Sequence, residues 1–165
     1  QVIGVEVTAG QQHILLGSKK GYTIHFKEEE VSDTGRNTKG SKGIKLKDGD
    51  EIISFNVTTN DDVVITLTDQ GRGKASPLDQ YELQKRNGVG LQTMSSDSYQ
   101  ILDIITTDKD DKIILVSKNA NLIEKNTQDI TQTKRLGGMY SQCDLKDDDQ
   151  IVKIVKLPKI ANNND

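Results

Sequence analysis

The chain has little of what several large protein classes depend on. Aromatic side chains make up 4% of the 165 residues and tryptophan is absent, which argues against a platform that stacks the bases of single-stranded nucleic acid. The single cysteine, Cys143, cannot form an internal disulfide. No apolar run approaches the length of a membrane-spanning helix, and the N-terminus lacks the charged and apolar regions of a signal peptide. We therefore expect a cytosolic protein without a membrane span.

What the sequence contains is an internal repeat with a period of 49 to 50 residues. One position of the repeat holds Arg36, Arg86 and Arg135, and another holds Gly21, Gly71 and Ala120. A fixed period of this length is typical of propellers and solenoids, in which one unit cannot bury its own apolar face. The function must therefore be sought in what recurs.

The apolar residues of each repeat favour short strands rich in Ile, Val and Leu, as half-buried strands require. In the first complete copy we expect strands near residues 13–18, 23–26, 30–33 with an extension to 36, and 51–58. Turn signals such as Lys47-Asp48-Gly49-Asp50 separate them, and no segment has a sustained helical period. The sequence therefore predicts an all-β, propeller-like fold with blades of four strands.

The repeats also predict how the chain is divided. The apolar series Val2, Ile3, Val5 and Val7 begins as far before Ile14 as Ile52 lies before Val64, so the chain opens in the second half of a repeat. We expect a single β domain over residues 1–157, made of a half repeat 1–9 and repeats of approximately 10–59, 60–108 and 109–157. Residues 158–165 are polar and are expected to be a disordered tail.

Several motifs are weaker than they first look. Gly35 and Gly40 have the glycine spacing of a phosphate-binding loop, but Ser41 stands where that loop needs lysine. His13 and His25 occur in one copy with no cysteine at ligand spacing, so structural roles are favoured over metal binding. Cys143 has no nearby histidine in the sequence that would make it a nucleophile. The sequence thus offers no catalytic residue and no metal ligands.

Two motifs carry a resemblance to a known family. Gly71-Arg72-Gly73-Lys74, with Pro77, Tyr81 and the run Gln84 to Leu91 after it, is similar to a repeat of the C-terminal domain of the DNA gyrase A subunit. Gly35 to Gly40, ahead of Asp50-Glu51-Ile52-Ile53, resembles another repeat of that domain. The resemblance covers the chain except its tail. It implies a β-pinwheel, with blades of four strands around an axis and strands exchanged between neighbours, and it favours gyrase over topoisomerase IV.

The chain also departs from that family. The wrapping box of gyrase has the pattern Gln-Arg-Arg-Gly-Gly-Lys-Gly, and the segment most similar to it runs from Gln84 to Gly90. Asn87 replaces a glycine of the box and Val89 replaces its lysine, so we interpret this segment as a degenerate repeat. Because a pinwheel of this family commonly has five or six blades, the copies in this chain are expected to form part of a larger ring.

The charge distribution alone does not decide whether the chain binds nucleic acid. The formal net charge is −3, but basic residues gather in the loops that recur after each set of strands, next to glycines that let main-chain amides approach phosphate. A surface of solvated lysines would look the same, and the resemblance decides between the two interpretations. The candidate DNA-binding residues are Arg36, Lys39, Lys42, Lys45, Arg72, Lys74, Lys85, Arg86, Lys134 and Arg135.

The resemblance implies a function for the chain within a larger enzyme. It would be the non-catalytic portion of a bacterial type IIA topoisomerase that binds and bends double-stranded DNA on its outer rim, in the cytoplasm and associated with the nucleoid. Its partners would be the ATPase B subunit together with the rest of the A subunit. No cofactor is expected in this chain, because ATP and magnesium would act on other domains. The alternatives are a propeller-like protein-interaction module and a structural module that has lost DNA wrapping.

Overall fold

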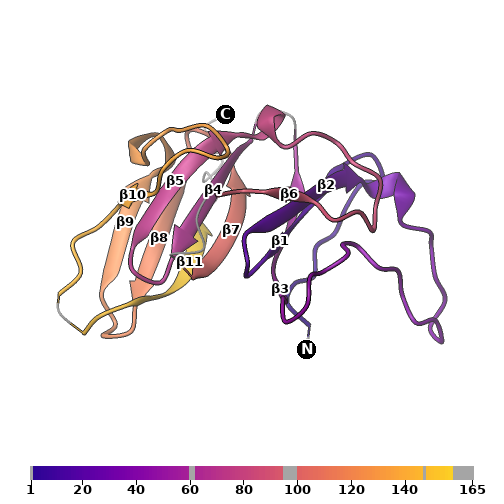
Figure 1. Ribbon diagram of the computed structural model, residues 1–165, viewed down its shortest axis with the longest axis horizontal. Helices are drawn as coiled ribbons and strands as arrows, with labels where there is room; N and C mark the ends of the chain where they lie inside the picture. Colours follow the sequence, from indigo (N-terminus) through magenta and orange to yellow (C-terminus); the bar gives the residue numbers. More distant parts are fainter. Residues whose placement is uncertain (1, 60–61, 95–99, 147, 158–165) are drawn as a thin grey trace, which may run out of the picture.

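The computed structural model describes residues 2–59, 62–94, 100–146 and 148–157, and within them the chain forms three antiparallel sheets, which we call blades 1 to 3 (Figure 1). Blade 1 has the order β3 (Ile52–Thr58), β1 (His13–Ser18), β2 (Tyr22–Lys27) and β6 (Leu91–Gln92). Blade 2 has the order β10 (Tyr140–Ser141), β5 (Arg72–Pro77), β4 (Val63–Thr68) and β7 (Ile101–Thr107). Blade 3 contains β11 (Ile151–Leu157), β8 (Lys112–Ser117) and β9 (Leu122–Asn126). The predicted all-β fold of repeated sheets is confirmed.

The second and third repeats each supply three strands to their own blade and one short strand to the blade before it. β6 follows blade 2 in the chain but pairs with β2 of blade 1, where Leu91 lies opposite Thr23. β10 follows blade 3 and pairs with β5 of blade 2, where Tyr140 lies opposite Gly73. The short strands therefore tie consecutive blades together through main-chain hydrogen bonds.

The prediction of a third strand near residues 30–33, with an extension to residue 36, is wrong. The chain forms the short 3₁₀ helix η1 (Glu28–Glu30) there, and no strand is assigned between residues 31 and 51. The same turn recurs as η2 (Leu78–Gln80) and η3 (Thr127–Asp129). Beyond η2 and η3 the chain leaves its own blade. The outer edges of blades 1 and 2 are instead filled by β6 and β10, which come from the following repeat.

Residues 2–12 likewise contain no assigned strand, although their valines predict one. Val2, Val5 and Val7 are exposed. The division of the chain into a half repeat and three repeats stays a prediction, and the expected tail, residues 158–165, lies outside the described residues.

The core lies between the blades, because alternate residues of a strand face opposite sides of its sheet. Leu15 of β1 packs with Val64 of β4 and with Ile104 of β7 in one cluster between blades 1 and 2. Ile65 of β4 packs with Leu115 of β8 in a second cluster between blades 2 and 3. The inner strands are consequently buried on both faces, as the continuous burial of β4 shows.

The first turn of each repeat requires a left-handed residue. Gly21, Gly71 and Ala120 have φ angles of 81°, 70° and 63°, and the N–H of each donates to the carbonyl three residues earlier. Glycine adopts this conformation without the steric cost that Ala120 bears. The sequence match of these three positions therefore reflects a shared backbone geometry. The helices among the described residues are too short to cross a bilayer.

Candidate nucleic-acid interface

The basic loops of the second and third repeats lie across the blade that precedes each of them. After η2 the chain runs over blade 1, where the N–H of Gln84 donates to the carbonyl of His25. After η3 it runs over blade 2 in the same way, where the N–H of Thr133 donates to the carbonyl of Ala75. Figure 1 shows both segments along one edge of the molecule, before β6 and before β10.

Arg86 fastens the loop of the second repeat to the first repeat. Its Nε donates to the main-chain oxygen of Glu30 at 2.9 Å, and its Nη1 donates to the main-chain oxygen of Lys42 at 2.6 Å. Its own N–H donates to the Glu30 carboxylate at 2.8 Å. The guanidinium thus holds two segments of the preceding repeat at once, using the fork geometry that lysine lacks.

Arg135 makes the same contacts one repeat later. Its Nε donates to the Gln80 main-chain oxygen at 3.1 Å, its Nη1 donates to the Gln92 main-chain oxygen, and its N–H donates to Gln80 Oε1 at 2.7 Å. Gln80 and Gln92 are the counterparts of Glu30 and Lys42. The sequence suggested both arginines as DNA contacts. In the structure they are half-buried, and their guanidinium groups donate hydrogen bonds to the preceding repeat.

Lys74 corrects the sequence prediction, because its side chain is fully buried in β5. Its Nζ donates to the main-chain oxygens of Lys134, Arg135 and Gly137, the last at 3.0 Å. Burial lowers the pKa of the Lys74 ammonium to about 8, and the positive charge of Arg135 acts in the same direction. A cation enclosed by three carbonyls supports the loop from below and is inaccessible to a phosphate.

Arg72 is also half-buried, with its Nη2 donating to the main-chain oxygen of Met139 at 2.8 Å. The six other predicted residues are exposed, and they are Arg36, Lys39, Lys42, Lys45, Lys85 and Lys134.

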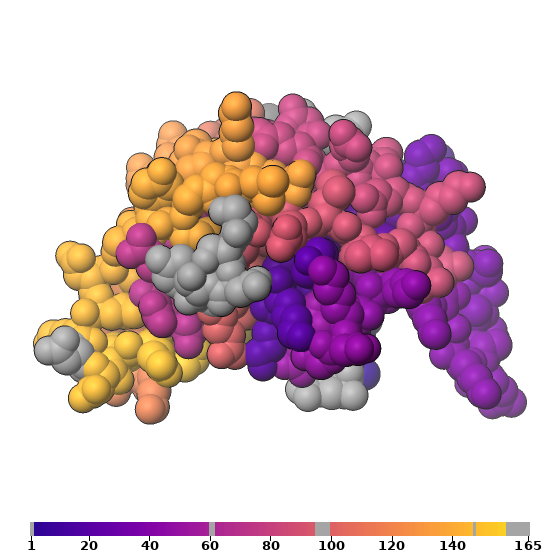
Figure 2. Space-filling model, in the orientation of Figure 1, coloured from indigo at the N-terminus to yellow at the C-terminus, as the bar shows by residue number. Residues whose placement is uncertain are grey.

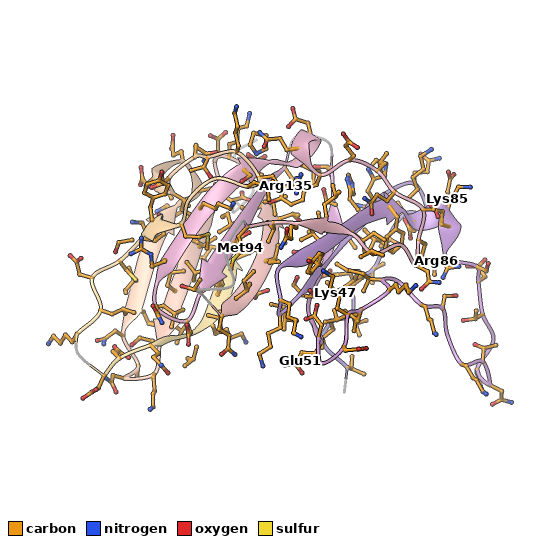
Figure 3. The ribbon with its side chains drawn as sticks, viewed as in Figure 1. Lys47, Glu51, Lys85, Arg86, Met94 and Arg135 are labelled. Atoms are coloured by element: carbon orange, nitrogen blue, oxygen red, sulfur yellow. The ribbon has the colours of Figure 1, made fainter. Side chains whose placement is uncertain are left out.

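Three of these exposed lysines are brought together from two repeats. The N–H of Lys45 donates to the carbonyl of Gly88 at 2.8 Å, and the N–H of Asn87 donates to the carbonyl of Gly43 at 2.7 Å. Together with the Arg86 contact to the Lys42 carbonyl, these bonds lay residues 42–45 beside residues 85–88. We call Lys42, Lys45 and Lys85 the basic cluster; Figure 3 shows Lys85 and Arg86 at one end of the molecule.

The basic cluster keeps its charge available. Among the described residues, no carboxylate forms an ion pair within 4.0 Å of any of its three ammonium groups. Two lysines outside the set of candidate DNA-binding residues lie against neighbouring side chains instead. Lys19 pairs with Glu51 at 2.6 Å, and the Lys47 ammonium lies 4.1 Å from the centre of the Tyr22 ring.

Lys134 extends the basic edge by one repeat. It is exposed at the position equivalent to Lys85, directly before the arginine that binds the preceding repeat. Arg135 is labelled in Figure 3 between the two ends of the molecule, away from Lys85. The first repeat has Gly35 at this position. Within the described chain, exposed lysines therefore stand beside two successive interrepeat arginines.

The described chain offers no other chemistry of this kind. No group of three or more His, Cys, Asp or Glu side chains that could hold a metal lies within the described residues. Burial raises the pKa of the Cys143 thiol, which disfavours the thiolate that a nucleophile needs.

Comparison with known proteins identifies the family. The family model of the DNA gyrase C-terminal domain, described as a beta-propeller, matches residues 12–59 and 62–119. The chain belongs to this family. Among curated relatives, the DNA gyrase A subunit of Haloquadratum walsbyi is 30% identical over 169 residues, covering 100% of this chain and 20% of the relative. The corresponding gyrase protein of Staphylococcus aureus strain MRSA252 is 29% identical over 166 residues, covering 98% and 19%.

Solved structures of the gyrase and topoisomerase IV C-terminal domains share the fold. The C-terminal domain of DNA topoisomerase IV superposes with a TM-score of 0.87 and 25% identity, covering 95% of this chain and 50% of that one. The DNA gyrase A C-terminal domain gives a TM-score of 0.77 and 24% identity, covering 90% and 51%. The chain thus spans about a fifth of the curated relatives and about half of these domains.

Proposed function

We propose that this member of the gyrase C-terminal domain family binds and bends double-stranded DNA as a non-catalytic part of a type IIA topoisomerase. The observation that carries the proposal is the basic cluster, in which two repeats place Lys42, Lys45 and Lys85 together and exposed. Three exposed cations on one pair of adjacent loops can contact neighbouring phosphates of one duplex, which scattered lysines could not do together. Lys134, one repeat further, and Lys39 extend the contact.

The cations of the interface stand on a rigid support. Arg86 and Lys74 each bind main-chain carbonyls of loops that carry an exposed lysine, so the loops need little ordering when DNA binds. The direction of the row of exposed cations would change from one blade to the next, and a duplex that follows this row would bend. The phosphate backbone, and not the base sequence, would be recognised.

The holoenzyme roles are part of the same proposal. The chain would act with the ATPase B subunit, with the rest of a gyrase-like A subunit, and with ATP and magnesium bound on those other parts. It would hold a duplex segment for strand passage in the cytoplasm, at the nucleoid. The family match and the gyrase relatives support this assignment, and gyrase is preferred over topoisomerase IV because the curated relatives are gyrase subunits.

The test is binding of a labelled duplex followed by fluorescence anisotropy over a salt series. We expect the logarithm of affinity to fall linearly with the logarithm of salt concentration, by about 0.9 for each phosphate contact. Replacing Lys42, Lys45 and Lys85 by glutamine should lower both the affinity and this slope. The matched control is Lys153→Gln, which removes an exposed cation from β11. Energy transfer between dyes at the two duplex ends should rise on binding if DNA bends.

Two outcomes would overturn the proposal. One is the absence of duplex binding even at low salt, which would favour a structural or protein-interaction module. The other is binding that the triple replacement leaves unchanged relative to the Lys153 control, which would place any DNA contact elsewhere.

A further inference from the structure

His13 and His25 meet on the face of blade 1 that packs against blade 2. They are 12 residues apart in the chain, and the pairing of β1 with β2 brings them together, with Leu15 opposite His25. Because Leu15 packs with Ile104 of β7, this face is covered by a blade of the described chain. Figure 2 shows the indigo to purple atoms of the first repeat against the rose atoms of the second. We call His13 and His25 the histidine pair.

The other blades have no histidine at the equivalent positions. In blade 2 these positions hold Val63 and Ala75, which belong to one core cluster. In blade 3 they hold Lys112 and Glu124, whose charged groups form an ion pair at 2.6 Å. The register of the two strands thus brings together an apolar pair, an ion pair and, in blade 1, two imidazoles. The blade itself therefore does not require histidine here.

A main-chain carbonyl fixes the tautomer of His25. Its Nδ1 lies 2.7 Å from the Tyr81 oxygen, which can only accept a hydrogen bond, so Nδ1 carries the proton. The lone pair of Nε2 then faces His13 Nδ1 at 3.2 Å. Burial lowers the pKa of His25, which keeps this imidazole neutral. A neutral imidazole whose other nitrogen donates to a carbonyl is the usual state of a histidine that binds a metal.

The spacing of the two nitrogens suits a tetrahedral metal ion. Two imidazole nitrogens that each lie about 2.0–2.1 Å from one Zn²⁺ ion are about 3.3 Å apart at the tetrahedral angle, and about 2.9 Å apart at a right angle. The observed 3.2 Å agrees with the tetrahedral value. For His13 to bind in this way, its proton moves from Nδ1 to Nε2. The neutral pair then takes up the metal with no net loss of a proton.

A hollow gives the histidine pair access to solvent. His13 is half-buried and lines a surface hollow of about 280 Å³ together with residues 10–12, Lys27 and Glu29. The Lys27 ammonium and the Glu29 carboxylate are exposed and lie 3.4 Å apart, so their charges offset each other beside the hollow. Among the described residues, no third carboxylate, thiol or imidazole joins the pair as a ligand. Water from the hollow would therefore supply the remaining ligands.

We propose that the histidine pair binds a Zn²⁺ ion through His13 Nδ1 and His25 Nε2, with water at the other two tetrahedral positions. Two protein ligands with water make an open, exchangeable site rather than a closed structural one. The Tyr81 carbonyl is a positioning group, because it fixes the nitrogen that His25 offers. The same segment docks here through the N–H of Gln84, which donates to the His25 carbonyl. A bound metal would stiffen this crossing, and the proposal does not depend on DNA binding.

Isothermal titration calorimetry with zinc chloride near neutral pH tests the site. A Cys143→Ser chain is the parent, because a thiolate is itself a zinc ligand. We expect one zinc per chain. His13→Gln and His25→Ala should each raise the dissociation constant at least about tenfold, the loss that follows when even an outer partner of a ligand is removed. His13→Gln keeps a polar side chain at a half-buried position, and far-ultraviolet circular dichroism verifies its fold.

The matched control is Lys27→Gln, which alters the residue opposite His13 without removing a ligand and should not weaken binding. The absence of zinc binding by the parent would overturn the proposal. A dissociation constant that His13→Gln and His25→Ala leave unchanged would do the same, because it would place the ion elsewhere. Weaker binding by Lys27→Gln than by His13→Gln would also contradict the site.

Urea unfolding gives an independent measure of the same site. The two imidazoles are 12 residues apart in the unfolded chain, so zinc should bind the folded chain preferentially and raise the urea midpoint of the parent. The shift should disappear in His13→Gln, and also near about pH 5, where protons compete for the imidazoles. Magnesium prefers oxygen ligands and should give no shift. No zinc shift in the parent, or an equal shift in His13→Gln or with magnesium, would refute the histidine pair as the site.

Discussion

Arg86 and Arg135 bind equivalent pairs of main-chain oxygens, one repeat apart. Arg86 takes those of Glu30 and Lys42, and Arg135 takes those of Gln80 and Gln92. Each guanidinium joins the end of a 3₁₀ turn to a distant loop, at a point where the chain passes from one blade to the next. The recurring arginine is thus a junction residue of the pinwheel, and the neighbouring lysines are left to face solvent.

Removing such a junction should cost stability. Arg86→Gln and Arg135→Gln each leave two carbonyls without a charged donor, and hydrogen bonds to charged groups contribute about 1.5–3 kcal/mol each. Because both arginines are only half-buried, we expect a total loss of about 2 kcal/mol for each variant. Urea denaturation monitored by far-ultraviolet circular dichroism measures it.

Arg36→Gln is the matched control for these variants. Its side chain is exposed, so the free energy of unfolding should stay within about 0.5 kcal/mol of the parent. Equal losses in the three variants would refute the junction role of Arg86 and Arg135.

The apolar pattern predicts most of the strands, whereas the exchange of strands between blades was expected only from the family resemblance. Apolar, β-branched segments mark β1, β3, β4, β7, β8 and β11, because the side chains of these strands pack into the cores between the blades. β6 and β10 have two residues each, and main-chain bonding to another repeat holds them, which leaves no hydrophobic pattern. Val31, Tyr81 and Ile130 suggested a strand after the turn, although Tyr81 and Ile130 instead fill the cores between blades.

The site was predicted in part, for a similar reason. Arginine and lysine were grouped by charge, but the partners of Arg86 and Lys74 are carbonyl groups, which no sequence pattern displays. Recurrence was the usable signal: arginine stands at one position in all three copies, whereas the residue before it changes from Gly35 to Lys85 and Lys134. The shared arginine position marked a structural role for Arg86 and Arg135, whereas the variable position before it is exposed in all three copies.

The left-handed turn position offers a stabilising change. Ala120→Gly should raise the free energy of unfolding by about 0.5–1 kcal/mol, because glycine tolerates a φ of 63° without a Cβ clash. Gly71→Ala should lower the free energy of unfolding by more than about 1 kcal/mol. The new Cβ would lie 2.7 Å from Cys143 Sγ, and the alanine would also have to adopt a φ of 70°. Thermal unfolding of both variants checks the opposite signs. A destabilised Ala120→Gly would show that the turn is held by other forces.

His25 makes the junction of blade 1 sensitive to acid. Its Nδ1 donates to the Tyr81 carbonyl at 2.7 Å, so its Nε2 accepts from His13 Nδ1 at 3.2 Å. Burial lowers the pKa of His25, the Tyr81 carbonyl opposes this shift, and His13 adds to it. The unfolded chain therefore binds a proton more readily below pH 6.5, and stability should fall as the pH drops from there.

The His25→Ala variant isolates this effect, since Ala75 occupies the equivalent position in β5. Urea midpoints between about pH 5 and 7.5, the range in which histidine changes charge, should decline less steeply for the variant than for the parent. This holds whatever the absolute difference in stability. Parallel pH curves would mean that protonation of His25 is not linked to folding.

Lys74 should affect stability at the alkaline end of the pH range. Its folded pKa of about 8 lies below the ordinary value of 10.5, so both folded and unfolded chains hold the proton below pH 8. Between those values the unfolded chain binds more protons than the folded chain. The contribution of Lys74 to stability should therefore rise there by at most about 1.4 kcal/mol per pH unit.

Lys74→Met removes this titration while keeping the length of the buried side chain. The difference in unfolding free energy between parent and variant should be constant from about pH 7 to 8 and then grow up to pH 10.5 in favour of the parent. All other ionisable groups are common to the two proteins, so the difference between them isolates Lys74. A difference that stays flat across the whole range would show that Lys74 keeps its charge in the folded protein, held by the carbonyls of residues 134, 135 and 137.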